Sequence, residues 1–205
     1  QKNRFWYFLA NKDYNPSTRI DLIFDFITKK TDKDTDKDYS YRKFQNLFNH
    51  IKNQSLKLDQ LWEDYTIQTF AKAWDKVKEV FQRFLYWYEN PVIYHYVGYL
   101  DWNKISIVAI YHKCNGISKS ETVKKLRSLI KSNVFNNMTP NEIDEYQYDE
   151  NPREIRKTLL LFNIETCVLQ QQREDGVNYY RFPFDLYKEM GWDIEHINSQ
   201  KDNVL

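Results

Sequence analysis

Large aromatic side chains at helical spacing are the feature that most constrains this chain. The 205 residues include 16 Tyr, 13 Phe and 6 Trp, against only four Gly and five Pro. This composition excludes a disordered or collagen-like protein, and the core has to be built largely from rings. Between residues 58 and 90 the apolar residues recur every three or four positions, as they do on one face of a helix. They are Leu61, Trp62, Tyr65, Phe70, Trp74, Val77, Phe81, Phe84, Leu85 and Tyr88.

Start and stop signals divide the rest of the chain into further helices. Thr18 with Asp21, and Ser118 with Glu121, have the spacing of capping boxes. Segment 58–90 is predicted as one helix, or as two with a break near 66–69, and Asn90-Pro91 should end it. After residue 176 the alternation changes and favours strands over 177–184 and 191–197. We predict a mainly α fold, a multi-helix bundle with a small β element at the C-terminal end. The other predicted helices cover 18–30, 41–51, 92–100, 104–113, 118–132, a short segment from 139, and 152–167.

Charge and glycine content exclude several function classes. Lys and Arg number 30 against 29 Asp and Glu, so charge-driven binding has to come from a local patch. No two glycines lie close enough to form a phosphate-binding loop, which excludes a Walker A motif and a dinucleotide fingerprint. Cys114 and Cys167 cannot form a zinc site of cysteine pairs, and they favour a reducing compartment. No apolar stretch approaches the ~20 residues of a membrane span. We expect a soluble, cytoplasmic protein without a membrane partner.

Four aspartates alternate along residues 32–38, a pattern that resembles a calcium loop. An EF-hand that begins at Asp32 requires Gly at its sixth position and a bidentate Glu at its twelfth. Lys37 and Lys43 occupy those positions, and interleaved lysines neutralise the carboxylates. We therefore interpret the segment as a solvated, charged loop.

One predicted helix, residues 117–132, is strongly basic. It carries five cations against the single acid Glu121, while Val123, Leu126 and Ile130 form its apolar side. A ridge of cations on one face can lie along a phosphate backbone, because each neutralised phosphate releases counterions. A solvated outer face explains the same residues, and both interpretations stay open here. The candidate DNA-binding residues are Lys119, Lys124, Lys125, Arg127 and Lys131.

The four histidines fall into two groups. His50, His95 and His112 have no acidic or cysteine neighbour at ligand spacing, so we interpret each as a core or surface residue. His196 differs, since it follows Glu195 within the segment 192–197, whose sequence is WDIEHI. An acid and a histidine beside an apolar strand are what an HNH nuclease needs at its first strand. Adjacent strand side chains point to opposite faces, so both groups reach one phosphate only where the strand ends or bulges.

Several motifs, in order along nearly the whole chain, resemble GmrSD-type modification-dependent restriction proteins. The segments 159–165 (LLLFNIE), 181–187 (RFPFDLY) and 192–197 look like the entry to their C-terminal HNH module. The segments 5–9 (FWYFL), 18–21 (TRID) and 87–100 resemble the helical part that follows their ParB-like N-terminal module. The resemblance divides the chain into residues 1–148, a helical region after that module, and residues 149–205, the helical entry and first strand of an HNH module.

The resemblance implies a bacterial phage-defence protein that binds and hydrolyses nucleotide and cleaves DNA, often foreign DNA with modified bases. It implies that His196 is the catalytic general base and Glu195 a ligand of a divalent metal such as Mg²⁺. The family's Asp-Gly-Gln-Gln-Arg nucleotide motif is absent, and Leu205 precedes the Asn that would complete the metal site. We therefore expect a central fragment that is inactive alone, from a parent that is an HNH endonuclease.

Two other functions fit the same residues. A non-enzymatic helical module would dock DNA or a partner through the ridge between Lys119 and Lys131, and its binding would weaken steeply with salt. A spacer would only relay nucleotide state between end modules, and no residue in the sequence discriminates this case.

Overall fold

A computed structural model describes residues 2–9, 18–30, 36, 38–46, 62–170 and 180–190. These residues are almost entirely helical and contain no strand, so the mainly α prediction is confirmed. None of the described helices is long and apolar enough to cross a membrane. Besides a helical segment at 39–46, the elements are α1 (Lys2–Leu9), α2 (Arg19–Thr28), α4 (Trp62–Glu89), α5 (Pro91–Trp102), α6 (Ile107–Lys113), α7 (Lys119–Leu129), the π-helix η1 (Ile130–Val134), α8 (Pro140–Asp144), α9 (Pro152–Gln170) and α10 (Phe184–Met190).

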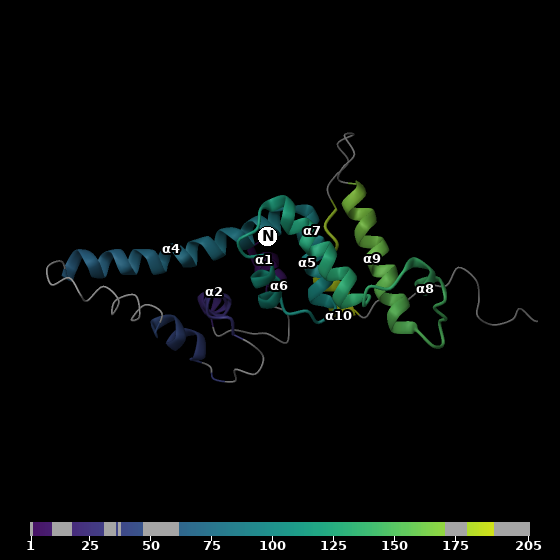
Figure 1. The fold of residues 1–205 in the computed structure, drawn as a ribbon, viewed down its shortest axis with the longest axis horizontal. Helices are drawn as coiled ribbons and strands as arrows, with labels where there is room; N and C mark the ends of the chain where they lie inside the picture. The colour runs from purple at the N-terminus through teal and green to yellow at the C-terminus, as the bar shows by residue number, and fades with distance from the viewer. Residues whose placement is uncertain are drawn as a thin grey trace, which may run out of the picture.

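Helix α5 forms the centre of the fold (Figure 1). It contacts α4, α6, α7, η1, α9 and α10, and every residue from Ile93 to Leu100 is buried. A helix that is apolar on all sides has to lie inside a protein, which explains this position. Tyrosines suit it because each ring fills the core while its hydroxyl reaches a polar partner at the edge. Tyr99 Oη, for example, donates to the carbonyl of Lys157 at 3.0 Å.

Helix α4 is the longest described element and continues without a break through residues 66–69, so the single-helix alternative is confirmed. Its buried residues Val77, Val80, Phe84 and Trp87 follow a three- and four-residue spacing that faces α2 and α5. The N-terminal half extends away from the other labelled helices in Figure 1. As predicted, α4 ends at Asn90-Pro91, where the Asn90 side chain accepts from the Ile93 N–H at 3.0 Å and begins α5.

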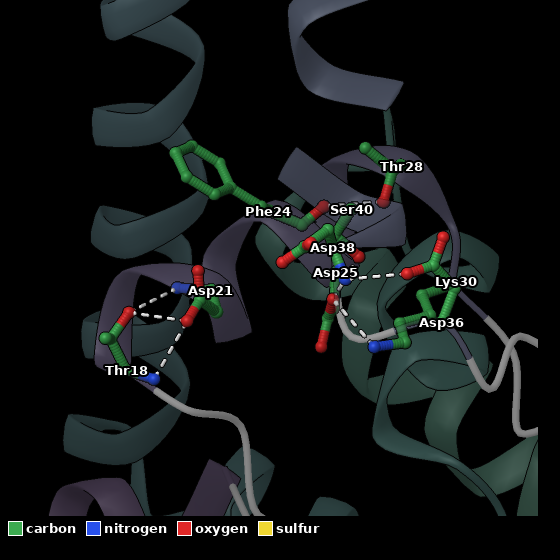
Figure 2. Close-up of polar contacts among 9 residues, drawn as sticks. All are labelled: Thr18, Asp21, Phe24, Asp25, Thr28, Lys30, Asp36, Asp38 and Ser40. Carbon is green, nitrogen blue, oxygen red and sulfur yellow. Dashed lines mark hydrogen bonds and ion pairs between the residues drawn. The ribbon is translucent and has the colours of Figure 1, made fainter. Parts of the chain in front are cut away.

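The predicted capping boxes are present at two helix starts. At α2 the Thr18 N–H donates to Asp21 Oδ2 at 2.9 Å, and Thr18 Oγ1 accepts from the Asp21 N–H at 3.2 Å (Figure 2). Ser118 and Glu121 repeat this arrangement at α7. These bonds satisfy N–H groups that have no partner within the helix, so the start of each helix is fixed locally.

The strand prediction at 177–184 is wrong for its described part. Residues 180–183 have no regular structure, and α10 begins at Phe184. Side chains of α5 take the place of a neighbouring strand: the Phe182 N–H donates to His95 Nε2 at 3.1 Å, and the Phe182 carbonyl accepts from Tyr94 Oη at 3.1 Å. Residues 177–179 and 191–197 are not among the described residues, and the division at 148/149 stays a prediction.

Candidate nucleic-acid interface

Helix α7 and the π-helix η1 carry the predicted basic ridge. The buried residues Leu126, Leu129 and Ile130 face the core, and α7 and η1 both contact α5. This apolar side fixes the rotation of α7, so its opposite face has to point outward. The cations are therefore displayed on a helix that is anchored to the centre of the fold.

The structure separates the five predicted DNA-binding residues. Lys124, Arg127 and Lys131 are exposed and stand three and four residues apart, on one face of the helix. Lys119 Nζ lies 4.5 Å from the centre of the Tyr86 ring on α4, a cation–π contact away from that face. Lys125 lies near Cys114, where burial raises the pKa of the thiol and the lysine charge partly opposes that rise. We name Lys124, Arg127 and Lys131 the α7 ridge.

Arg127 is held in place by two other helices. Its Nε donates to Tyr96 Oη on α5 at 2.9 Å, and Tyr96 Oη donates to Glu165 Oε2 on α9 at 3.2 Å. Burial is the main cause that raises the pKa of Tyr96 to about 12, so its phenol stays protonated. Because Nε is occupied, the guanidinium edge that remains exposed is oriented rather than free to rotate.

A pocket opens beside Arg127 and Lys131. Its volume is about 500 Å³, and it lies between α7–η1, α8 and α9. Most of its wall is apolar, while cations, one carboxylate and a few hydroxyl and amide groups contribute polar atoms. The apolar residues are Ile130, Phe135, Met138, Pro140, Ile143 and Leu161, and the polar ones are Arg127, Lys131, Asn137, Thr139, Thr158 and Glu165.

The backbone next to this pocket is irregular. The sequence predicted an α-helix to about Ser132, whereas α7 passes into the π-helix η1 at Ile130. Asn136 and Asn137 then adopt left-handed conformations with φ of 48° and 61°. Short stretches of π-helix and left-handed residues are frequent at functional sites, and asparagine tolerates positive φ better than most residues. The adjacent asparagines were the only sequence signal for this feature.

Two of the histidines have structural roles, as predicted. His95 is fully buried. Its Nε2 accepts from Phe182, so Nδ1 carries the proton and donates to the Pro91 carbonyl at 2.7 Å. Burial is the main cause that lowers the pKa of His95 to about 4, which keeps the ring neutral. His112 Nε2 donates to the carbonyl of Phe26 at 2.8 Å. His50, Glu195 and His196 are not among the residues that the structure describes.

A second group of polar residues surrounds Asp25 on α2 (Figure 2). Asp25 is 2% exposed, Ser40 Oγ donates to its Oδ1, and Lys30 Nζ lies 3.7 Å from the same oxygen. Burial raises the pKa of this carboxyl, while Ser40 and Lys30 partly oppose the rise. Asp25 lies on α2, Lys30 follows the C-cap of that helix, and Ser40 lies on the 39–46 helix, so this buried group ties the two helices together.

Of the aspartate-rich segment 32–38, interpreted above as a charged loop, the structure describes only residues 36 and 38. Asp36 accepts from the Asp38 N–H at 3.0 Å and pairs with Arg42, which agrees with a charged loop. Within the described ranges, no group of three or more His, Cys, Asp or Glu is arranged to hold a metal ion.

Comparisons with known proteins found no relative. No protein-family model, no curated protein and no solved structure shows significant similarity to this chain. The resemblance to GmrSD-type proteins therefore continues to depend on the sequence motifs alone. What the structure adds is the geometry of the α7 ridge and of the pocket beside it.

Proposed function

We propose that this chain docks on the phosphate backbone of DNA through the α7 ridge, as the helical part of a GmrSD-like restriction endonuclease. The observation that carries the proposal is the exposed, aligned set of Lys124, Arg127 and Lys131 on a helix fixed to the core. None of the three forms a salt bridge with another described residue. Lys124 and Lys131 are thus available to an external anion. Arg127 offers the part of its guanidinium that does not bond to Tyr96, and Glu165 lies near enough to offset some of its charge.

The length of the ridge suits a nucleic-acid strand. From Lys124 to Lys131 the helix rises by roughly 10 Å, at about 1.5 Å per residue. One strand of duplex DNA presents a phosphate about every 3.4 Å along the axis. Three side chains over this span can therefore neutralise two or three phosphates. Such contacts position the protein on DNA and carry no base specificity by themselves.

Acidic residues restrict how DNA can approach. The segment around α8 exposes five carboxylates: Glu142, Asp144, Glu145, Asp149 and Glu150. These groups repel phosphate, whereas the α7 ridge attracts it. The proposed duplex therefore lies along α7 and avoids the outer surface of α8. With a formal charge of only +1 on the whole chain, this local contrast is the main source of steering.

The nuclease part of the proposal depends on residues outside the structure's described ranges. In the parent protein, His196 would take a proton from the attacking water, and Glu195 would bind a divalent metal such as Mg²⁺. Plasmid nicking that depends on Mg²⁺ is the activity that we expect of the parent. If His196→Ala in the parent leaves cleavage intact, the catalytic assignment is wrong.

Docking is tested by binding to a fluorescently labelled duplex at several salt concentrations. We expect the logarithm of affinity to fall with the logarithm of salt concentration with a slope of roughly −2 to −3, because each phosphate contact contributes about −0.9. The double variant Lys124→Glu/Lys131→Glu should bind at least about tenfold more weakly and with a shallower slope.

The matched control is Lys72→Glu/Lys113→Glu, which makes the same charge change at exposed lysines of α4 and α6. It should retain most of the binding. Equal losses in the two double variants would show that net charge alone matters. Absence of binding by the unmodified chain at low salt would refute the docking proposal.

A further inference from the structure

We infer that the pocket between η1, α8 and α9 binds one nucleoside phosphate unit, with its heteroaromatic ring among the apolar walls and its phosphate at Lys131 and Arg127. This inference extends the proposed function, because these two cations also belong to the α7 ridge. The unit is either a free mononucleotide or one nucleotide of a single strand. Both present the same chemistry to the pocket, and the experiment below separates them.

The size and lining of the pocket suit a planar ring. A volume of about 500 Å³ lies within the range of small-molecule sites. Ile130, Phe135, Ile143 and Leu161 supply apolar wall from η1, α8 and α9 and from the residue that follows η1. Removing a ring from water against such a surface is favourable without further contacts. The apolar walls therefore favour binding of a planar ring but do not distinguish one set of ring substituents from another.

The charged groups select an anion. Two cations, Arg127 and Lys131, line the pocket with one carboxylate, Glu165. That carboxylate already accepts from Tyr96 through Oε2, and Tyr96 in turn accepts from Arg127 Nε. The charge of Glu165 is thus offset by Arg127, and Lys131 remains as excess positive charge. A guanidinium edge and an ammonium group one helical turn apart are typical phosphate ligands.

The polar atoms in the wall favour a heteroaromatic ring over an acyl chain. Asn137 brings an amide with donors and an acceptor, and Thr139 brings a hydroxyl oxygen. Glu165 brings carboxylate oxygens that accept hydrogen bonds. The edge of a nucleobase carries both donors and acceptors and can pair with such groups. A fatty acid has a carboxylate but no polar atoms along its body, so its body could form no hydrogen bond with these groups.

The wall is held in shape by hydrogen bonds of its own. The Asn137 N–H donates to the Lys131 carbonyl at 2.9 Å, and the Met138 N–H donates to the Phe135 carbonyl at 2.8 Å. Tyr146 Oη donates to Met138 Sδ at 3.0 Å. These bonds fix the left-handed turn after η1 and with it the positions of Phe135 and Asn137. A site whose shape exists before the ligand arrives loses less entropy on binding.

Binding is tested by titrating the chain with the four common nucleoside 5′-monophosphates, followed by NMR. Dissociation constants of roughly 10 µM to 1 mM are expected for at least one monophosphate. The matching nucleoside should bind at least about tenfold more weakly, since it lacks the phosphate. Octanoate, an anion of aliphatic body, should not displace the nucleotide. No binding by any monophosphate or by a single-stranded oligonucleotide, or equal binding by octanoate, would overturn the inference.

Two pocket variants and one ridge variant separate the pocket from DNA docking. Ile143→Trp should fill the cavity and abolish mononucleotide binding. Asn137→Asp keeps a side chain that tolerates positive φ, adds a negative charge at the site and should weaken binding about tenfold or more. It serves as the test if Ile143→Trp fails to fold. Lys124→Glu lies outside the pocket, so it should weaken duplex binding and leave mononucleotide affinity unchanged.

The outcomes distinguish the two sources of ligand and the two proposals. If free monophosphates bind and Ile143→Trp removes them, the pocket takes a free nucleotide. If only a single-stranded oligonucleotide binds, and Ile143→Trp weakens it while duplex binding is unchanged, the pocket takes one unit of a strand. If both pocket variants bind nucleotide as the unmodified chain does, the pocket assignment is wrong, whatever Lys124→Glu does to the duplex. Loss of duplex binding alone would leave this assignment standing.

Discussion

Helices α5 and α7 pack against each other, yet they use their side chains in opposite ways. On α5 all residues from Ile93 to Leu100 are buried, and His95 Nε2 and the hydroxyls of Tyr96 and Tyr99 are bonded to residues outside the helix. On α7 only Thr122, Leu126 and Leu129 are buried, and cations occupy much of the rest. One helix is devoted to the core, and the other presents charge to solvent.

The contrast shows where stability and function are separable. Changes on α5 disturb close-packed rings and buried hydrogen bonds, so they should lower the free energy of unfolding. Changes on the outer face of α7 remove charges that have water around them, and the fold should tolerate them. The affinity for an anion should instead fall when the outer face of α7 is changed, and should depend little on α5 as long as the protein folds. Each prediction below tests one side of this contrast.

The largest effect should come from protonation of His95 on α5. In the folded protein its pKa is about 4, against about 6.5 when unfolded. Between pH 4 and pH 6.5 the histidine is protonated in the unfolded chain and neutral in the folded chain, so lowering the pH favours unfolding. Stability attributable to this group is intact above pH 6.5 and should fall by up to about 3 kcal/mol as pH drops to 4.

This fall is measured by denaturant unfolding at several pH values. His95→Gln removes the titrating group, so its unfolding free energy should vary less with pH, although it is lower at neutral pH. His112 is only partly buried, and His112→Gln serves as the matched control that should keep the steep dependence. Identical pH profiles for the unmodified chain and His95→Gln would contradict the buried, neutral assignment.

The next largest loss of stability should come from a substitution at the contact between α5 and α10. A Cβ added at Gly98 would lie 2.3 Å from Phe184 Cε2, closer than any real contact. Alanine normally favours a helix by up to about 1 kcal/mol over glycine. Here the overlap should reverse that preference, and Gly98→Ala should destabilise by about 1–3 kcal/mol.

Thermal or denaturant unfolding measures this loss, and a second substitution shows its cause. The double variant Gly98→Ala/Phe184→Leu replaces the obstructing ring with a smaller side chain. It should be less destabilised than the sum of the two single variants. If the free-energy changes of the two single variants simply add, contact with Phe184 is not the reason why position 98 requires glycine.

Local signals predicted much of the fold. The capping boxes at Thr18 and Ser118, and the stop at Asn90-Pro91, are set by residues within four positions of each other, so the sequence displays them directly. The residues at 180–184 show the limit. Their alternation favours a strand, but His95 and Tyr94, nearly 90 residues earlier, bind the backbone of Phe182 and replace a strand partner.

In the candidate site, too, local features could be predicted from the sequence and long-range contacts could not. The cations of α7 were evident from the sequence, and helical spacing placed Lys124, Arg127 and Lys131 on one face. The pocket was not evident, because its walls come from helices that only tertiary packing brings together. The bonds from Arg127 to Tyr96 and from Tyr96 to Glu165 span 31 and 69 residues. No local pattern encodes such contacts, nor the burial of Leu160 beside the exposed Phe162.

The smallest effect on stability should come from the α7 ridge itself. Lys124→Glu/Lys131→Glu should change the free energy of unfolding by no more than about 0.5 kcal/mol, because both side chains are exposed and form no salt bridge with a described residue. One small cost is expected, since Glu at position 124 stands three residues from Glu121. Denaturant unfolding at moderate salt gives the value, and the DNA titration of the same preparation gives the affinity. A large drop in the free energy of unfolding with unchanged affinity for DNA would contradict the docking proposal. The cations of α7 would then stabilise the fold, as the side chains of α5 do.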